Sequence, residues 1–324
     1  MTIAPELTGD RMGTPPTVSV VIAAFSSERW DYLREAVASV AAQTRAPLET
    51  IVVIDHNPDL LERARRELAA VVIPNAGARG ASGARNTGVA HSHGEVVAFL
   101  DDDAAATGTW LDRLVTHFAD PGVVGVGGRL DPLWATARPR WFPGEFGWTV
   151  GVSYTGMPER TAHVRNVWSN NMAVRRAAFE AVGGFREDFG KVGAVSRPED
   201  TDLCLRVTGG AWLYDPACAV SHWVPAQRAR FRYFLVRCFN EGRGKAGLAA
   251  LNGRRASTSQ ERGYTARVLP RAVLRGLGEA LRGDAAGALR GAAIIAGLAV
   301  TMAGYVLGAA ATLPLTAPAG GAYR

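Results

Sequence analysis

The chain has 324 residues, of which 48% are hydrophobic, so it can bury a sizeable core and is not a wholly disordered protein. Its net charge of +6 is unevenly distributed, because the residues from Ala226 onward hold 15 Lys and Arg against 4 Asp and Glu. A basic tail on an acidic body predicts an anionic partner, such as phosphate groups or a membrane surface. Three cysteines without a CxxC pair argue against a disulfide framework and a structural zinc site.

The first 16 residues contain acidic side chains and no apolar run. We expect a disordered leader over residues 1–16 that is not a secretory signal, and therefore a catalytic body in the cytoplasm. A catalytic domain is predicted over residues 17–225. A basic helical region on the membrane surface is predicted over 226–290, and a hydrophobic segment over 291–324.

Short β-branched runs alternate with helical patterns in the first third of the chain. The predicted strands are 18–25, 50–54, 71–73 and 95–100, and the predicted helices are 30–40, 60–68 and 81–90. This alternation indicates an α/β fold with a doubly wound, mostly parallel sheet.

Acidic residues follow two of these strands. Asp55 ends the second strand, and Asp101, Asp102 and Asp103 end the fourth. Doubly wound sheets bind ligands beyond the carboxyl ends of their strands. Four carboxylates at one edge repel one another unless a cation joins them, so a metal that bridges a diphosphate is one interpretation. A solvated acidic turn is the other.

The second half carries two further features. A helix over 198–207 begins with Glu199 and Asp200, and a short strand over 220–224 contains His222. A carboxylate within hydrogen-bond reach of a hydroxyl can act as its base. Taken alone, however, an acidic pair is also an ordinary helix start.

The tail contains two helical patterns. Between residues 267 and 282, arginines and leucines repeat on different faces, which is typical of a helix on an anionic membrane surface. Residues 292–313 form an apolar stretch long enough to cross a bilayer, and the alternative is a buried helical hairpin in a soluble domain. Gly304 and Gly308 form a GxxxG pair that would let a neighbouring helix approach closely. Basic side chains between Arg228 and Lys245 are candidates for a phosphate site or for a solvated face.

The order of the motifs resembles the family-2 glycosyltransferases, which have the GT-A fold. In chain order the motifs are VSVVIAAF, Asp55, GARNTG, FLDDDA, NNMAVRR, GGF and EDTDLCLR. The resemblance extends from Thr17 to Val224. It implies an enzyme that transfers a sugar, with inversion, from a nucleotide-diphosphosugar to a hydroxyl group.

The resemblance also implies roles for particular residues. The nucleotide-sugar would contact Ala23, Ala24, Asp55, Arg85, Asn86, Asp101 and Asp102. A divalent cation, Mn²⁺ or Mg²⁺, would be held by Asp103 with Asp101 and His222. Asp200 would be the general base, with Glu199 beside it, and the acceptor side would include Trp168, Asn170 and Asn171.

The implied donor is most often a UDP-sugar, and the implied acceptor is a lipid-linked or cell-surface glycan precursor at a membrane. The segment SERW at residues 27–30 resembles a subgroup that transfers glucuronic acid to lipid-linked glucose. The chain departs from the common pattern of the family at Phe25-Ser26 and Asp55-His56, so the resemblance does not determine which sugar is transferred.

Two other classes remain as alternatives. A nucleotidyltransferase would carry an early glycine-rich loop with a basic residue, which VIAAFSSERW lacks. A non-catalytic nucleotide-sugar-binding scaffold would not need Asp200. Nucleic-acid binding is not expected, because the basic tail has no interleaved stacking aromatics.

Overall fold

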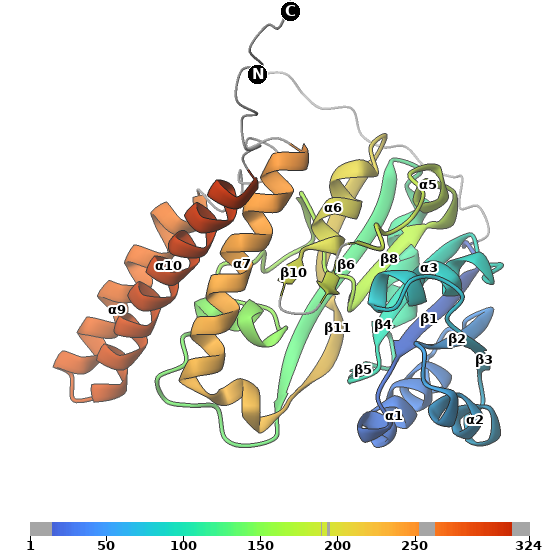
Figure 1. Ribbon diagram of the computed structural model, residues 1–324, viewed down its shortest axis with the longest axis horizontal. Helices are drawn as coiled ribbons and strands as arrows, with labels where there is room; N and C mark the ends of the chain where they lie inside the picture. The colour runs from blue at the N-terminus through green and yellow to red at the C-terminus, as the bar shows by residue number, and fades with distance from the viewer. Residues whose placement is uncertain (1–14, 189, 193–194, 253–262, 313–324) are drawn as a thin grey trace, which may run out of the picture.

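The computed structural model describes residues 15–188, 190–192, 195–252 and 263–312 (Figure 1). Almost all of the predicted leader, and the end of the predicted hydrophobic segment beyond residue 312, lie outside these residues. Within them, the main sheet has the strand order β3-β2-β1-β4-β8-β6-β11-β5, and β7 pairs with β11. A separate pair joins β9 and β10.

The first half follows the predicted alternation closely. Its elements are β1 (Val18–Ala24), α1 (Trp30–Ala41), β2 (Glu49–Ile54), α2 (Pro58–Glu67), β3 (Val71–Pro74), α3 (Ala81–Ala90) and β4 (Val96–Asp101). β1 pairs in parallel with both β2 and β4. Because successive strand residues point to opposite faces, Val20 and Ile22 pack with α1 and α2, whereas Val21 packs with α3.

The second half makes the sheet mixed. Its elements are β5 (Ala104–Ala106), α4 (Trp110–Thr116), β6 (Val123–Trp134), β7 (Ala162–Val164), β8 (Asn171–Arg175), α5 (Arg176–Ala181), β9 (Gly190–Val192), β10 (Val195–Arg197), α6 (Glu199–Arg206) and β11 (Ala211–Val224). β8 runs antiparallel to β4 and β6, while β6 and β11 are parallel. β11 is longer than the predicted 220–224 because its pairing with β6 continues across a register shift between Asp215 and Val220.

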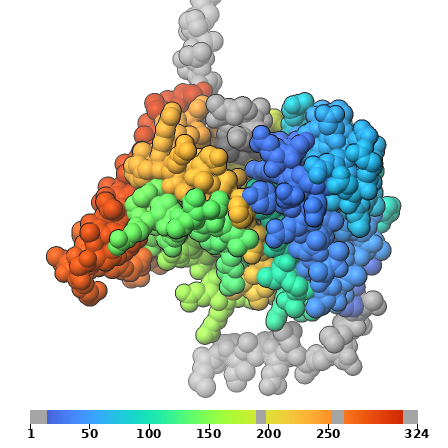
Figure 2. Space-filling model, turned by 90° about the horizontal axis from the view of Figure 1, so that it is seen from below, coloured from blue at the N-terminus to red at the C-terminus, as the bar shows by residue number. Residues whose placement is uncertain are grey.

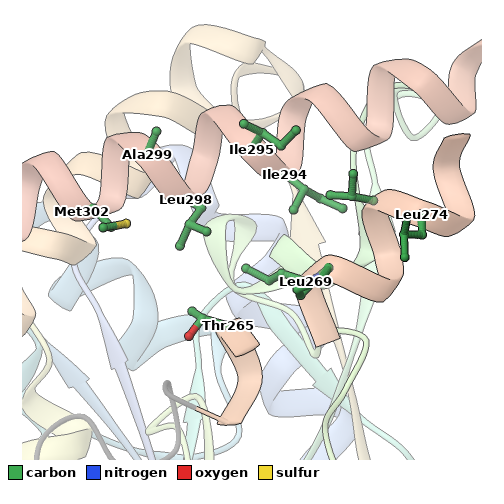
Figure 3. Close-up of a pocket in the computed structure, with 10 residues that line it drawn as sticks. Thr265, Leu269, Leu274, Ile294, Ile295, Leu298, Ala299 and Met302 are labelled. Carbon is green, nitrogen blue, oxygen red and sulfur yellow. The ribbon is translucent and has the colours of Figure 1, made fainter. Parts of the chain in front are cut away.

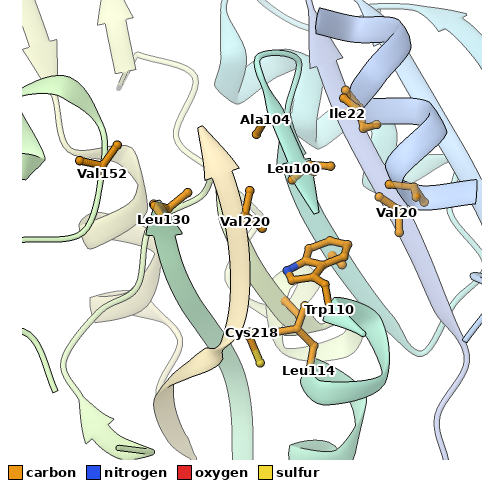
Figure 4. Packing of buried hydrophobic residues seen from close by; sticks show 14 of the residues in the cluster. Val20, Ile22, Leu100, Ala104, Trp110, Leu114, Leu130, Val152, Cys218 and Val220 are labelled. Atoms are coloured by element: carbon orange, nitrogen blue, oxygen red, sulfur yellow. The ribbon is translucent and has the colours of Figure 1, made fainter. Parts of the chain in front are cut away.

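Short helical turns connect these elements. Turns of 3₁₀ helix cover Ser27–Arg29, His117–Ala119, Gly144–Val150 and Ala226–Ala229. The core between the sheet and α4 is built around Trp110, which is fully buried (Figure 4). Leu100, Leu114 and Val220 belong to the same buried cluster. This packing joins the parallel half of the sheet to the strands that follow it.

The C-terminal helices lie at one edge of the molecule. They are α7 (Phe231–Asn252), a π-helical turn (Tyr264–Val268), α9 (Leu269–Leu281) and α10 (Ala285–Thr312). Figures 1 and 2 show α9 and α10 projecting from the side of the body that contains the sheet. Phe234, Leu269 and Ile294 nevertheless belong to the main core cluster, so these helices share their packing with the sheet.

The predicted close approach at the GxxxG pair is confirmed, and the neighbouring helix is α7. A Cβ atom on Gly304 would lie 2.1 Å from the carbonyl oxygen of Phe239. One on Gly308 would lie 3.0 Å from the Cα of Arg243. Only glycine therefore lets α10 pack this tightly against α7.

α10 is also the helix of the described residues that has the length and composition to cross a membrane, over Ala285–Ala311. Ile295, Met302 and Val306 on this helix are about three-fifths exposed. Arg275 on α9, one of the arginines in the predicted face, forms an ion pair with the buried Glu145. This arginine docks α9 on the body that contains the sheet.

Candidate active site

The carboxyl ends of β1, β2 and β4 lie side by side and bring together the predicted nucleotide-side residues. Ala23 is paired in register with Asp101, and the backbone N–H of Asp55 donates to the carbonyl of Ala24 at 2.7 Å. This is the sheet edge at which a doubly wound fold binds its ligands.

The Asp55 carboxylate is held by the loop that follows β3. The Asn75 side-chain amide donates to it at 2.7 Å, and the backbone N–H of Gly80 donates at 2.9 Å. Thr87 on α3 in turn donates to the Asn75 side chain at 2.8 Å. The glycine-rich turn is therefore tied to the end of β2.

The three consecutive aspartates have different environments. Asp101 pairs with Arg85 at 2.7 Å, and Asp102 pairs with Arg29 at 2.8 Å. Asp102 is buried, and its Oδ2 has no hydrogen-bond partner within the described part of the chain. Burial raises the pKa of Asp102 to about 7, although the nearby Arg29 guanidinium opposes the shift.

Asp103 is the aspartate with the most cationic surroundings. Its carboxylate lies 3.0 Å from Arg29, 3.3 Å from His222 and 3.8 Å from Arg228. Burial opposes its ionisation, but the hydrogen bond from His222 and the charges around it outweigh burial and hold the pKa of Asp103 at about 2. Asp103 is therefore a carboxylate near neutral pH.

Asp101, Asp103 and His222 form a cluster that could hold a metal ion. One ligand atom from each lies within 4.8 Å of the others. The antiparallel pairing of β11 with β5 sets His222 opposite Ala104, and the Trp223 N–H donates to the Asp103 carbonyl at 2.9 Å. The His222 Nδ1 atom is buried without a hydrogen-bond partner among the described residues. The two carboxylates are ligands that suit both Mn²⁺ and Mg²⁺.

The acid pair lies at the start of α6 and is joined to the aspartates by Arg85. The Arg85 guanidinium, which is buried, lies 2.7 Å from Asp101 and 3.5 Å from Glu199. Two motifs that are far apart in the sequence thus share one buried cation. The structure places Arg85 between them.

Asp200 lies beside Glu199 in a desolvated setting. Its carboxylate accepts a hydrogen bond from the Thr201 N–H at 2.6 Å. Burial raises the pKa of Asp200 to about 7, and the negative charges of Glu199 and of Glu241 on α7 add to the rise. A base whose pKa lies near neutrality is well matched to removing a proton from a hydroxyl.

We expect the rate of sugar transfer to rise with pH through about 7, because only the ionised Asp200 can accept a proton. Glu241→Gln removes a negative charge that faces Asp200, so the rising limb should move to lower pH while the plateau above it stays unchanged. The measurement is a pH profile of kcat/KM, with Glu180→Gln, an exposed residue paired with Arg176, as the control. If the rising limb of the pH profile stays at the same pH in Glu241→Gln, the limb reports the titration of a group other than Asp200.

Two predicted site residues make hydrogen bonds within the fold. The half-buried Asn86 side chain donates to the Phe185 carbonyl at 2.8 Å and accepts from the Phe185 N–H at 2.9 Å, so its contact with a nucleotide stays a prediction. Asn171 is 1% exposed. It accepts from Trp110 Nε1 at 2.8 Å and donates to the carbonyls of Arg129 and Cys218. Asn171 therefore ties strands together, which corrects its predicted acceptor-side place.

Asn171→Leu should destabilise the protein by at least about 3 kcal/mol, because it leaves an indole N–H and two carbonyl oxygens buried without this partner. Thermal unfolding in detergent measures this effect. A variant with unchanged stability and a raised KM for the acceptor would instead restore the acceptor-side interpretation.

Trp168 and Asn170 are both half-buried. Trp168 packs on Tyr154, with ring centroids 5.9 Å apart, and lines a cavity of about 340 Å³. The Asn170 amide donates to the Gly151 carbonyl at 3.4 Å, and its oxygen is buried without a partner among the described residues. A Cβ atom on Gly151 would lie 3.1 Å from the His222 ring, so Asn170 lies near the candidate metal ligands.

Sequence reasoning missed Glu241, and it included Arg29 only within the segment SERW and Arg228 only within a basic run. Arg29 lies in the turn after β1, at the ligand-binding edge, so the rule that located Asp55 could also have found it. Arg228 and Glu241 reach the site only because the chain returns across it after β11. No local sequence pattern predicts that these two residues lie at the site.

Comparison with known proteins identifies the family. Residues 19–183 match the model of the family described as Glycosyl transferase family 2. The chain is 35% identical over 237 residues to the glucosyl-dolichyl phosphate glucuronosyltransferase of Haloferax volcanii, a match that covers 70% of this chain and 76% of that one. It is 32% identical over 171 residues to the succinoglycan biosynthesis protein ExoM of Rhizobium meliloti, covering 52% of each chain.

Among solved structures, the fold is similar to that of the mannosyltransferase PcManGT from Pyrobaculum calidifontis, which was solved in complex with GDP-Man and Mn²⁺. The TM-score is 0.58 at 20% identity, covering 93% of this chain and 90% of that one. The fold is therefore the GT-A fold of glycosyltransferases, as predicted. The chain belongs to glycosyl transferase family 2.

Proposed function

We propose that this protein transfers a sugar, with inversion, from a nucleotide-diphosphosugar to a hydroxyl of a lipid-linked glycan precursor at a membrane. The observation that carries the proposal is the link through Arg85, which joins Asp101 of the strand-end cluster to Glu199 of the acid pair. Donor and acceptor would meet between these two motifs. The family membership supports sugar transfer as the reaction.

In the proposed reaction, Asp200 takes the proton from the acceptor hydroxyl as its oxygen forms a bond to the anomeric carbon. The bond from that carbon to the diphosphate oxygen breaks, and the nucleoside diphosphate leaves with the electron pair. Because the attack comes from the face opposite the leaving group, the anomeric configuration inverts. The raised pKa of Asp200 keeps it basic enough for this step near neutral pH.

Asp101, Asp103 and His222 would hold the divalent cation, which would offset the charge of the diphosphate leaving group. Arg29 and Arg228 lie against the same cluster and would add positive charge beside the departing diphosphate. The mannosyltransferase of similar fold was solved with GDP-Man and Mn²⁺, which supports a nucleotide-sugar donor and a metal.

The lipid-linked acceptor is supported by the Haloferax volcanii relative, whose name specifies glucosyl-dolichyl phosphate as acceptor and glucuronic acid as the transferred sugar. α10, with its length and apolar composition, supports attachment to a membrane. The catalytic body is proposed to face the cytoplasm, where nucleotide-sugars are made.

The test is transfer by the full chain from UDP-glucuronic acid, UDP-glucose and GDP-mannose, with a membrane lipid extract as acceptor and with Mn²⁺, Mg²⁺ or chelator present. We expect metal-dependent transfer from one donor, and proton NMR of the product should show an inverted anomeric centre. Donor binding without turnover would favour a non-catalytic nucleotide-sugar scaffold. Release of a sugar 1-phosphate instead of a nucleoside diphosphate would identify a nucleotidyltransferase, because the nucleotidyl group would then be the group transferred.

A further inference from the structure

Two cavities of different chemistry meet at the π-helical turn Tyr264–Val268. Tyr264 and Val268 line the cavity of about 340 Å³ beside Trp168, whereas Thr265 and the adjoining Leu269 line a second cavity of about 530 Å³. A π-helical turn is a rare backbone feature that often marks a functional site. The same turn is therefore the wall between the two cavities.

The first cavity, which we name the aromatic pocket, is polar and aromatic. It is lined by Gly128, Tyr154, Gly156, Met157, Pro158, His163, Val164, Asn166, Val167, Trp168, Tyr214, Gly263, Tyr264 and Val268. The Val167 carbonyl lies 3.8 Å from the Cys204 sulfur, and Cys204 is one helical turn beyond Asp200 on α6. The aromatic pocket is therefore adjacent to the helix that carries the proposed base. Aromatic faces beside polar groups suit a sugar ring.

The second cavity, which we name the apolar groove, lies between α9 and α10 (Figure 3). It is lined by Thr265, Leu269, Pro270, Val273, Leu274, Ile294, Ile295, Leu298, Ala299 and Met302. Figure 3 shows Leu269, Leu298 and Thr265 around the same open space. Leu269 and Ile294 are nearly fully buried at its base, while Leu274 and Met302 are 67% and 60% exposed at its rim.

The lining decides what kind of occupant fits the groove. Thr265 is its only polar side chain, so there are almost no hydrogen-bond partners inside. A peptide segment would bring backbone N–H and C=O groups that need such partners, and burying them unpaired is costly. A hydrocarbon chain brings none, so its burial is favourable along its whole length.

We propose that the apolar groove holds the hydrocarbon chain of the acceptor, while the aromatic pocket takes its sugar head. This assignment rests on the proposed function, in which the acceptor is lipid-linked. The phosphate that joins head and chain would then lie at the π-helical turn. Arg267 in this turn and Arg271 just after it are exposed, and no ion pair engages them among the described residues. Two free guanidinium groups at this boundary complement a phosphate.

The experiment uses the full chain in detergent and a geranylgeranyl phosphate that carries a photoreactive diazirine on its chain. Cross-linked peptides are mapped by mass spectrometry, with unlabelled geranylgeranyl phosphate or phosphatidylcholine as competitor. We expect labelling on α9 and α10 residues that line the groove, and competition by the isoprenyl phosphate alone.

Ala299→Trp fills the groove, whereas Ala292→Trp places the same apolar side chain at an exposed position of α10 outside it. Both changes introduce the same side chain on the same helix. We expect Ala299→Trp to lower specific labelling by about tenfold or more, since loss of two buried methylene groups already gives this factor, and Ala292→Trp to leave it unchanged. As a second pair, Leu274→Glu at the rim should reduce labelling, and Leu277→Glu on the same helix should not.

Two outcomes would overturn the proposal and make the groove an ordinary contact with bilayer lipid. In the first, phosphatidylcholine reduces the labelling as much as geranylgeranyl phosphate does. In the second, the labelling falls to the same extent in both variants of each pair. Sugar transfer is measured on the same samples. If transfer fails in the wild type while groove labelling remains specific, the proposed function is wrong and the lipid site stands.

Discussion

Asp200→Asn should lower kcat by about 10²–10⁴-fold while donor binding is unchanged, because the amide cannot accept the acceptor proton. The half-buried carboxylate lies beside Glu199, and its pKa, raised to about 7, makes it a base that is half ionised near neutrality. Asparagine has nearly the same shape and carries no charge, so the fold should tolerate it. Transfer kinetics and donor titration calorimetry on the same preparation measure the two quantities.

The control is Asp112→Asn, which makes the same chemical change at an exposed ion pair with Arg45. This variant should keep the wild-type rate. If Asp200→Asn retained more than about one tenth of that rate, proton removal would have to be assigned to another group. Loss of donor binding in Asp200→Asn would instead place this residue on the donor side.

Asp103→Asn should weaken Mn²⁺ binding by at least about 100-fold, since even outer-shell partners of a metal ligand are worth about 10–100-fold in affinity. Asp103 faces His222 and Arg29, and its pKa of about 2 keeps it ionised. Removing this charge takes away the strongest anionic ligand of the cluster. Electron paramagnetic resonance of free Mn²⁺ measures binding without any donor.

Asp131→Asn, at an exposed pair with Arg129, is the matched control and should bind Mn²⁺ as the wild type does. Chelator should abolish transfer in the wild type, and added Mn²⁺ should restore it. Wild-type Mn²⁺ affinity in Asp103→Asn would contradict the proposed ligand set. Full activity in chelator would show that the arginines alone offset the diphosphate charge.

Much of the strand-end half of the site could be predicted from local pattern. β-branched runs followed by acids, as at Asp55 and Asp101, predict carboxylates at the ligand-binding edge of a doubly wound sheet. The paired register of Ala23 with Asp101 bears this out. The order of the motifs was enough for the family resemblance, and the family match confirms it.

Residue roles were harder to predict for neighbouring residues within one motif. Asn170 and Asn171 are adjacent and chemically identical, yet β8 turns Asn171 into the core and leaves Asn170 near Gly151. Asn86 follows Arg85 on α3, but Arg85 pairs with Asp101 whereas Asn86 donates to the Phe185 carbonyl. Side-chain direction on a strand or helix depends on the register of packing, which a motif does not state.

The sequence by itself determined the fold class, the family and the acids from which the site is built, because periodicity and strand-end chemistry are local properties. Only the tertiary structure decided that Arg85 bridges Asp101 to Glu199 and that His222 reaches Asp103 through the pairing of β11 with β5. The same holds for the groove between α9 and α10. These are contacts between distant segments, and they depend on how the whole chain closes its core, which no single stretch of sequence encodes.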